Sequence, residues 1–213
     1  MENMEIFETI RTTRAMRRLK SDPVPNELID KILDAAVCAP SGGNNQNWGF
    51  IVVSDKVLMR DVQRYYKKAF DTYVLPHYES QRDSPPAGMD VDSFSRQIKR
   101  VEHLTDHFHE APVWIVACLN TGSHPATYLS GASIYPAVQN MLLAARALGL
   151  GATLTTRHAF YAEQVDELFG LPNGVRSYAI LPIGYPEGKF GPLRRGSVDK
   201  VVFTNKWGET GDR

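Results

Sequence analysis

Four short segments, three of them nearly continuous apolar runs, constrain the fold of this chain most strongly. They read WGFIVV at 48–53, VWIVACL at 113–119, ATLTT at 152–156 and YAILPI at 178–183. Apolar runs of this length and composition are typical of strands that are buried on both faces of a sheet. Longer segments with helical periodicity lie between them. Helices and strands therefore alternate around one sheet, which predicts an α/β or α+β class.

The segments between the strands show the 3.6-residue spacing of amphipathic helices. We expect helices over 3–14, from 25 or 26 to 40, over 56–75, over 94–109, from 125 or 126 to 148, and over 162–169. The helix that ends at Leu148 is apolar around most of its circumference and should lie centrally. Residues 79–93, rich in Ser, Pro, Asp and Gly, form the most loop-like stretch and are expected to be mobile or to act as a lid.

Size and charge exclude several classes of protein. The chain has 213 residues, which predicts one domain over 1–213, and it has no net charge, with 24 Lys and Arg against 24 Asp and Glu. A neutral chain is a poor candidate for nucleic-acid binding. The N-terminus lacks the features of a signal peptide and no stretch approaches the ~20 apolar residues of a membrane span, so we expect a soluble, cytoplasmic protein. Cys38 and Cys118 lie in apolar segments and are interpreted as small buried side chains.

Positive charge is concentrated in two separate segments. Residues 11–20 hold five cations and no acid, and residues 194–200 hold three more cations. Arg14 and Arg17 are three residues apart and would point the same way at a helix end. Guanidinium groups are suited to phosphate because they are planar and always charged. The two segments are either solvated basic surfaces or are reserved for one anion.

Two loops and one pair of histidines are further candidates for chemistry. The loop APSGGNNQNW at 39–48 either brings backbone and amide donors to a polar ligand or simply connects a helix to a strand. Thr155 and Thr156 place two hydroxyl groups at a strand end. The glycines of GLGATLTT precede a strand, which is the reverse of the dinucleotide-binding fingerprint, so a Rossmann site is excluded. His103 and His107 lack a third ligand, and no metal site is expected.

Taken in order, these pieces resemble the nitroreductase family of flavin oxidoreductases over nearly the whole chain. Five motifs carry the resemblance, namely TRAMRRLKSDPVP at 13–25, APSGGNNQNW at 39–48, VQNMLLAARALGLGA at 138–152, LPIGYPEG at 181–188 and GPLRR at 191–195. The sequence also departs from the family pattern. Thr13 stands where many members have arginine, Ala15 where many have serine, and Asn47 where proline is usual before the tryptophan.

The resemblance implies an α+β, nitroreductase-like fold, with a central and mostly antiparallel sheet flanked by helices in a domain-interlocked homodimer. It also implies a variable substrate or lid segment at about 60–110 and an extended C-terminal arm at about 186–213. FMN is the implied cofactor and NAD(P)H the implied co-substrate. The implied cofactor-binding residues are Arg14, Met16, Arg17, Arg18, Pro40, Ser41, Gly42, Asn44, Leu154, Thr155, Thr156, Arg194 and Arg195. Ser41 and Asn44 belong to a loop that, in this family, touches flavin bound mainly by the other subunit.

The implied reaction is a ping-pong transfer of hydride from NAD(P)H through FMN to a nitroaromatic, a quinone or a related small acceptor. The chemistry belongs to the flavin, so no catalytic side chain is expected, although Thr156 is a candidate hydrogen-bond donor to flavin N5. The implied substrate pocket comprises Gly43, Tyr66, Phe70, Tyr73 and Phe94, whose aromatic rings are equally well explained as core. Two alternatives stay open: a reductive dehalogenase-like or other specialised flavoenzyme of the same fold, and a flavin-binding protein without turnover.

Overall fold

The computed structural model describes residues 4–86, 88–124 and 127–210. Its helices are α1 (Ile6–Thr12), α2 (Asn26–Val37), α3 (Lys56–Ala69), α4 (Leu75–Ser80), α5 (Val91–Asp106), α6 (Tyr128–Ala147) and α7 (Ala162–Leu168). Its strands are β1 (Trp48–Val53), β2 (Val113–Asn120), β3 (Gly151–Ala152) and β4 (Val175–Gly184). Short turns of 3-10 helix are η1 (Gly42–Asn44), η3 (Phe108–Glu110), η4 (Arg157–Tyr161) and η5 (Val198–Lys200), and a π-helical turn, η2, spans Phe70–Val74.

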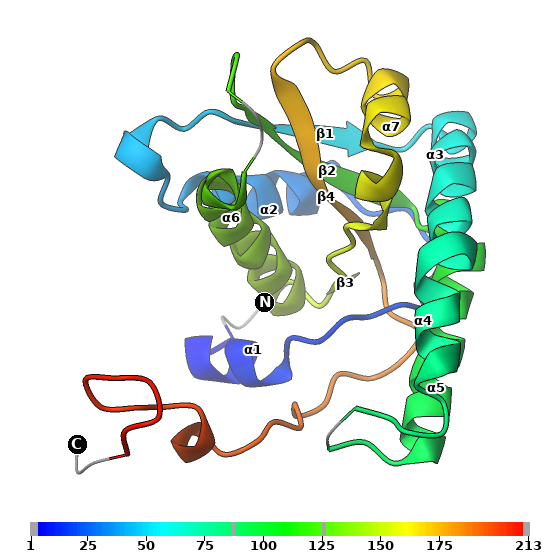
Figure 1. The fold of residues 1–213 in the computed structure, drawn as a ribbon. Helices are drawn as coiled ribbons and strands as arrows, with labels where there is room; N and C mark the ends of the chain where they lie inside the picture. Colours follow the sequence, from blue (N-terminus) through cyan, green and yellow to red (C-terminus); the bar gives the residue numbers. More distant parts are fainter. Residues whose placement is uncertain (1–3, 87, 125–126, 211–213) are drawn as a thin grey trace.

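The four strands form one sheet in the order β1-β2-β4-β3, and each neighbouring pair is antiparallel. The central pair, β2 and β4, runs in register from Val113 opposite Ile183 to Asn120 opposite Val175, with one irregularity between Ala117 and Cys118. Figure 1 shows helices on both sides of this sheet. The expected α+β class, with an antiparallel sheet flanked by helices, is confirmed.

Both faces of the two central strands are buried, which explains their continuous apolar runs, whereas the edge strand β1, expected to be buried, fully buries only Val53 and leaves Val52 47% exposed. On one face, Ile115 and Ala117 of β2 belong to a core formed with α2 and α6. On the other face, Trp114 and Val116 belong to a core formed with α3 and α7. Figure 1 shows α2 and α6 on one side of the strands and α3 and α7 on the other. Successive residues of β2 therefore point into different cores, as the pleat of a strand requires.

Helix α6 buries one stripe against the sheet and leaves another stripe uncovered in the single chain. Ile134, Val138 and Met141 are completely buried, whereas Leu129 is 65% exposed and Tyr135 is 40% exposed. The expected start of this helix, at 125 or 126, lies outside the described residues. None of the helices in the described part of the chain combines the length and the apolar character that a bilayer crossing requires.

The helix expected over 56–75 is longer than the sequence indicated. It continues through the π-helical turn η2 into α4 and ends at Ser80. Pro76, the second residue of α4, lies next to the end of the π-helical turn, and the helical conformation continues through it. Helix α5 begins at Val91, three residues before the expected Phe94, since the Asp90 carboxylate caps it by accepting from the Ser93 N–H at 2.6 Å. The loop between the two helices is therefore confined to residues 81–90.

Two further expectations were wrong. The strand expected over 152–156 is paired with β4 only at Gly151–Ala152 and then through a single bridge between Thr155 and Ile180. Cys38 is exposed and not buried, because it caps the C-terminal end of α2 outside the buried stripe of that helix. Cys118 is buried as expected.

The chain beyond β4 contains no regular element other than η5 among its described residues, which end at 210. In Figure 1 this segment runs past α1, at the side of the molecule away from β1. The Leu193 N–H donates to the Arg11 carbonyl at 3.0 Å, and the Arg146 guanidinium of α6 lies 4.1 Å from the centre of the Phe190 ring. Further on, Val201 is 71% exposed and Trp207 is 90% exposed.

Candidate functional site

The N-terminal arginine segment is fixed to the sheet by its own backbone. The Met16 N–H donates to the Ala152 carbonyl at 3.0 Å, and the Lys20 N–H donates to the Tyr185 carbonyl at 2.8 Å. A Cβ atom added at Gly151 would lie 2.9 Å from side-chain atoms of both Met16 and Leu19. Glycine at 151 therefore permits the close approach of this segment, and Arg17 is placed beside the end of β3.

The C-terminal arginines reach the same place from the far end of the chain. The hydrogen bond from Leu193 to Arg11 brings Arg194 and Arg195 next to Arg14. These three arginines line one cavity of about 500 Å³. The two cationic segments of the sequence thus converge, as expected if both serve one anion.

This cavity, which we call the arginine cavity, also has walls from the helical segment that precedes β2. Its lining residues are Arg14, Ala15, Arg17, Gly88, Met89, Ser93, Gln97, Arg100, Pro192, Leu193, Arg194 and Arg195. Among these described residues there are five guanidinium groups and no carboxylate. A concave surface with one sign of charge concentrates ligands of the opposite sign. The arrangement is therefore suited to an anion.

The contribution of α5 to this cavity was not foreseen from the sequence. Ser93, Gln97 and Arg100 line the cavity together. Their spacing of i, i+4 and i+7 places them on one face of the helix. That spacing of polar residues, opposite the buried Phe94, Ile98 and Val101, is the signal that the sequence offered.

Arg17 lies in an unusual electrostatic environment. Burial lowers its pKa, and the positive charges of Arg157 and Arg100 lower it further, while Tyr78 and Tyr66 act in the opposite direction. Guanidinium groups stay charged in proteins in spite of such shifts. A partly buried cation that is surrounded by like charges is stabilised when an anion binds next to it.

The two threonines that follow β3 have different surroundings. The Thr155 hydroxyl donates to the Ile180 carbonyl at 2.8 Å and its side chain is buried. Thr156 is exposed, as is its neighbour Leu154 at 40%. The single proton of the Thr155 hydroxyl is therefore already used in a hydrogen bond inside the sheet. Of the two hydroxyl groups, only that of Thr156 is exposed and in a position to meet a ligand.

The loop that contains Pro40, Ser41, Gly42, Gly43 and Asn44 does not line the arginine cavity of its own chain. The Gly42 N–H donates to the Ser133 hydroxyl of α6 at 3.0 Å. Gly43 has a φ of +59° and Asn44 one of +54°, so the loop turns sharply through left-handed backbone. Figure 1 shows this segment next to the start of β1, at the opposite side of the molecule from α5. A single chain thus does not bring the two predicted halves of the cofactor site together.

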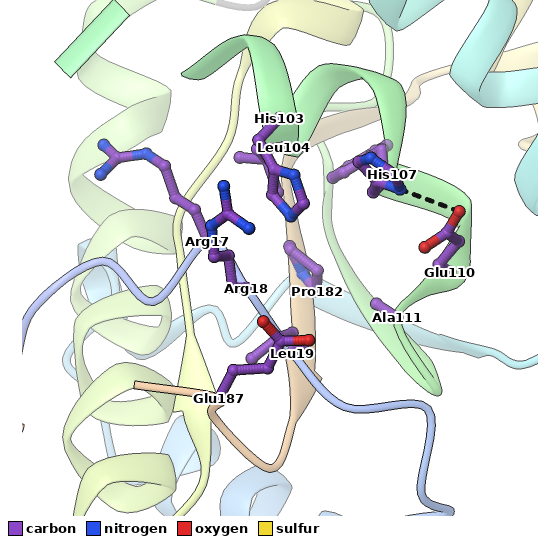
Figure 2. A pocket seen from close by; sticks show the side chains of 11 residues that line it. Arg17, Arg18, Leu19, His103, Leu104, His107, Glu110, Ala111, Pro182 and Glu187 are labelled. Carbon is purple, nitrogen blue, oxygen red and sulfur yellow. Dashed lines mark ion pairs between the residues drawn. The ribbon is translucent and has the colours of Figure 1, made fainter. Parts of the chain in front are cut away.

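A second cavity of about 210 Å³ lies on the other side of the arginine segment (Figure 2). Figure 2 shows the Arg18 side chain directed toward His103, whereas the Arg17 guanidinium lies further to one side. His107 Nδ1 pairs with the Glu110 carboxylate at 2.9 Å. Burial, followed by Arg18 and His107, lowers the pKa of His103. Within the described part of the chain, no group of three or more His, Cys, Asp or Glu side chains is arranged to hold a metal ion.

The predicted substrate-pocket aromatics are divided between the interior and the surface. Tyr66, Phe70 and Phe94 are buried, and the Tyr66 ring stacks on Phe108 with 4.1 Å between centroids. Tyr73 is 47% exposed and stacks on the exposed Phe160 at 4.5 Å. In the single chain, Tyr66, Phe70 and Phe94 are therefore core residues. A role of any of the four aromatic side chains in a substrate pocket stays a prediction.

Comparison with known proteins identifies the family. The model of the nitroreductase family matches residues 10–185. The chain belongs to the nitroreductase family. The resemblance drawn from the five motifs is thereby confirmed.

Two curated relatives show the range of activities among similar proteins. This nitroreductase-family enzyme is 30% identical over 211 residues to a protein of Methanothermobacter thermautotrophicus named for NADH dehydrogenase and NAD(P)H nitroreductase activity, covering 97% of this chain and 90% of that one. It is 26% identical over 212 residues to iodotyrosine deiodinase 1 of Rattus norvegicus, covering 96% of this chain and 70% of the rat protein.

Solved structures give the same picture. A structure of oxidised iodotyrosine deiodinase bound to FMN and 3-iodo-L-tyrosine superposes with a TM-score of 0.72 at 26% identity, covering 95% of this chain and 99% of the other. A nitroreductase from Desulfitobacterium hafniense with bound FMN superposes with a TM-score of 0.67 at 25% identity, covering 95% of this chain and all of the other. Both similar proteins therefore hold FMN on this fold.

Proposed function

We propose that this nitroreductase-family enzyme is an FMN-dependent oxidoreductase that takes a hydride from NAD(P)H and passes it to a small acceptor such as a nitroaromatic or a quinone. One observation carries the proposal: two arginine segments almost 180 residues apart, together with α5, enclose a cavity that has five guanidinium groups and no carboxylate among its described lining. The FMN found in two similar structures supports this assignment.

The residues of the arginine cavity fit FMN. A phosphate dianion is suited to the exposed Arg14, Arg194 and Arg195, since a guanidinium group bonds phosphate through two parallel N–H donors. Arg17, the half-buried arginine of the same cavity, would lie nearer the ring system. Bound FMN would supply the two-electron chemistry, and the protein would supply binding, orientation and charge.

Thr156 completes the proposed ring environment. Leu154 and Thr156 are exposed next to the bridge between Thr155 and Ile180. A hydroxyl or backbone donor at this position would meet the flavin edge and orient the ring. Hydride transfer needs no side-chain acid or base, which agrees with a site built mainly from binding groups.

We further propose that two copies of the chain form the enzyme. The predicted cofactor loop at 41–44 lies away from the arginine cavity of its own chain, so a second copy is needed to supply it. Helix α6 has exposed apolar residues on the side away from the sheet, and the C-terminal segment exposes Val201 and Trp207. Exposed apolar side chains along one helix and on the C-terminal segment support a surface that a second copy covers in the assembly. Light scattering coupled to gel filtration tests this proposal, and a monomer at micromolar concentration would contradict it.

The cofactor and the reaction are tested on the full-length protein. Purified protein is stripped of ligand and titrated with FMN, and quenching of flavin fluorescence reports binding. NAD(P)H is then added without oxygen, and we expect the absorbance of bound FMN to bleach and to return when a nitroaromatic or a quinone is added. Failure to bind FMN would contradict the proposal. Bound flavin that stays oxidised in NAD(P)H would favour a flavin-binding protein without turnover.

Reductive dehalogenation is the second candidate, and the similarity to iodotyrosine deiodinases favours it. The reduced protein is offered 3-iodotyrosine and, separately, a nitroaromatic acceptor. Release of iodide with formation of tyrosine, at a rate that exceeds nitro reduction, would decide for the dehalogenase.

A further inference from the structure

Arg157 is a partly buried arginine that none of the five family motifs contains. It is the first residue of η4 and directly follows Thr156. Its Nη1 donates to the Thr105 hydroxyl of α5 at 2.5 Å. Its guanidinium lies 4.4 Å from the centre of the Tyr66 ring and 5.1 Å from that of Phe70. The side chain is thus held between α3, η2 and α5, in one orientation.

This guanidinium has no carboxylate partner among the described residues. None of the ion pairs in this part of the chain includes Arg157, Arg17 or Arg100. Burial lowers the pKa of Arg157, and Tyr66 and Tyr78 act in the opposite direction. Arg157 also lowers the pKa of Arg17, so the two cations are close enough to repel each other.

Two neighbouring, partly buried cations without an acid are costly unless an anion binds beside them. The phosphate of FMN does not meet this need, because Arg14, Arg194 and Arg195 would hold it at the exposed end of the cavity. Of the five arginines that line this cavity, Arg17 is the only one that is half-buried, and Arg157, whose charge acts on Arg17, directly follows Thr156 in the chain. The negative charge that this pair would balance therefore belongs to the ring end of the cofactor.

Flavin acquires such a charge in the reaction proposed above. When NAD(P)H is oxidised to NAD(P)⁺, the transferred hydride brings two electrons and one proton to the ring system. The ring then carries one negative charge until a second proton arrives. Charge close to the ring is one of the means by which a protein adjusts flavin reactivity.

We propose that Arg157 is a positioning residue that, through Arg17, favours the reduced over the oxidised form of bound FMN and so raises its reduction potential. This inference rests on the proposed function. It assigns to a residue outside the phosphate-binding motifs the task of holding a fixed positive charge behind the flavin edge. The hydrogen bond to Thr105 and the contact with Tyr66 keep that charge in place.

The test compares neutral and charged replacements of Arg157 in the FMN-loaded protein. Arg157→Met removes the charge and keeps an elongated side chain, Arg157→Gln removes the charge and keeps a donor for Thr105, and Arg157→Lys keeps the charge. The matched control is Arg64→Met, since Arg64 is on α3 but its side chain is 80% exposed. The measured quantities are the two-electron midpoint potential, the dissociation constant for oxidised FMN, and the melting temperature.

We expect both neutral variants to favour reduced FMN about tenfold less than the wild type, which is a fall in midpoint potential of about 30 mV. Arg157→Lys and Arg64→Met should stay near the wild-type potential. A purely structural role would lower the melting temperature of all three Arg157 variants without moving the potential, and that result would overturn the inference. If Arg157→Met does not fold, Arg157→Gln decides.

The failure of this inference is distinguishable from failure of the proposed function. Wild-type protein that binds no FMN would contradict the proposed function and, with it, the role of Arg157. Wild-type protein that binds and reduces FMN, with the neutral variants at an unchanged potential, would contradict only the role of Arg157.

Discussion

The backbone N–H of Met16 donates to the carbonyl of Ala152, and this bond of 3.0 Å joins the arginine segment to the strand that precedes Thr156. The relative position of Arg17 and Thr156 is therefore set by main chain, which is less variable than long side chains. A binding site with this support is pre-organised, so that little conformational entropy is lost when the ligand binds.

Gly151→Ala tests whether this close approach holds the site together. The new Cβ would lie 2.9 Å from side-chain atoms of Met16 and Leu19, so either β3 or the arginine segment must shift. We expect the free energy of unfolding to fall by about 1–3 kcal/mol, the usual cost of overpacking, and FMN to bind more weakly. Urea denaturation and fluorescence titration measure the two effects. Gly196→Ala is the control, because nothing lies within 4 Å of a Cβ at that position.

Arg195→Ala tests the proposed phosphate end of the arginine cavity. Loss of one charge-assisted hydrogen bond costs about 1.5–3 kcal/mol, so the dissociation constant for FMN should rise by about ten- to a hundredfold. Arg195 is exposed, and the melting temperature of the ligand-free protein should not change. Arg64→Ala serves as control for the loss of a surface arginine. Unchanged flavin occupancy in Arg195→Ala would remove this residue from the site.

Thr155→Val should lower the stability of the fold, whereas Thr156→Val should slow flavin reduction. The first substitution removes a hydroxyl donor from the buried Ile180 carbonyl, which keeps the Thr155 N–H at 3.1 Å, and we expect a loss of about 0.5–1.5 kcal/mol in the free energy of unfolding. The second removes an exposed hydroxyl, so the fold should keep its stability while flavin reduction by NAD(P)H slows several-fold. Denaturation curves and anaerobic stopped-flow absorbance separate the two. Equal reduction rates in Thr156→Val and wild type would refute a hydroxyl donor at 156.

His158 makes the stability of the fold dependent on pH. Burial lowers its pKa to about 4, although the Ser177 carbonyl and Asp166 act in the opposite direction. Between pH 4 and 6.5 the unfolded chain binds the proton more readily than the folded chain, so stability rises with pH through this window. The wild type should lose up to about 3 kcal/mol on going from pH 7 to pH 4 through this group.

The measurement is urea denaturation at several pH values, for wild type and for His158→Gln. Burial also lowers the pKa of His103 and of His109, and these two contribute with the same sign. The difference between the two proteins isolates His158, and His77→Gln is the control for an exposed histidine. Parallel pH profiles for wild type and His158→Gln would show that His158 is not protonated in the unfolding reaction.

The sheet was predictable because its strands are apolar on both faces. Trp114 and Ile115 enter different cores, and no polar residue interrupts the run that contains them. The end of β3 was not predictable, since the alternation over 152–156 resembles a strand whether or not a partner strand is available. The backbone N–H of Met16, which lies more than 130 residues earlier in the chain, donates to the Ala152 carbonyl. That carbonyl is therefore not available to pair with a further strand.

The residues of the candidate site were likewise predictable only in part. Arg14, Arg17 and Arg195 stood out because like charges are dense around them, and the structure brings them to one cavity. Arg157 did not stand out because it is an isolated cation in its segment, and Arg100 did not because it lies with Arg96 and Lys99 on an amphipathic helix, where cations are common on the solvated side. The importance of Arg157 arises from its contacts with Tyr66 and Thr105, and that of Arg100 from its place in the arginine cavity. Both also act on the charge of Arg17, and none of these tertiary relations is contained in the spacing of a single sequence.

The π-helical turn at Phe70–Val74 has a consequence for how this segment can vary. A π turn holds one more residue than the α-helical turn that it replaces, and each residue of an α-helix is rotated by about 100° from the one before. Deleting a single residue between 70 and 74 would therefore restore a regular helix with little rotation of α4, and Tyr78 would keep its place at the edge of the Phe94 ring, 5.8 Å away. The same deletion within the regular part of α3 or α4 would instead rotate the rest of the helix by about 100°. This turn is thus the place where the segment can change in length by one residue while α4 still presents the same side chains to α5.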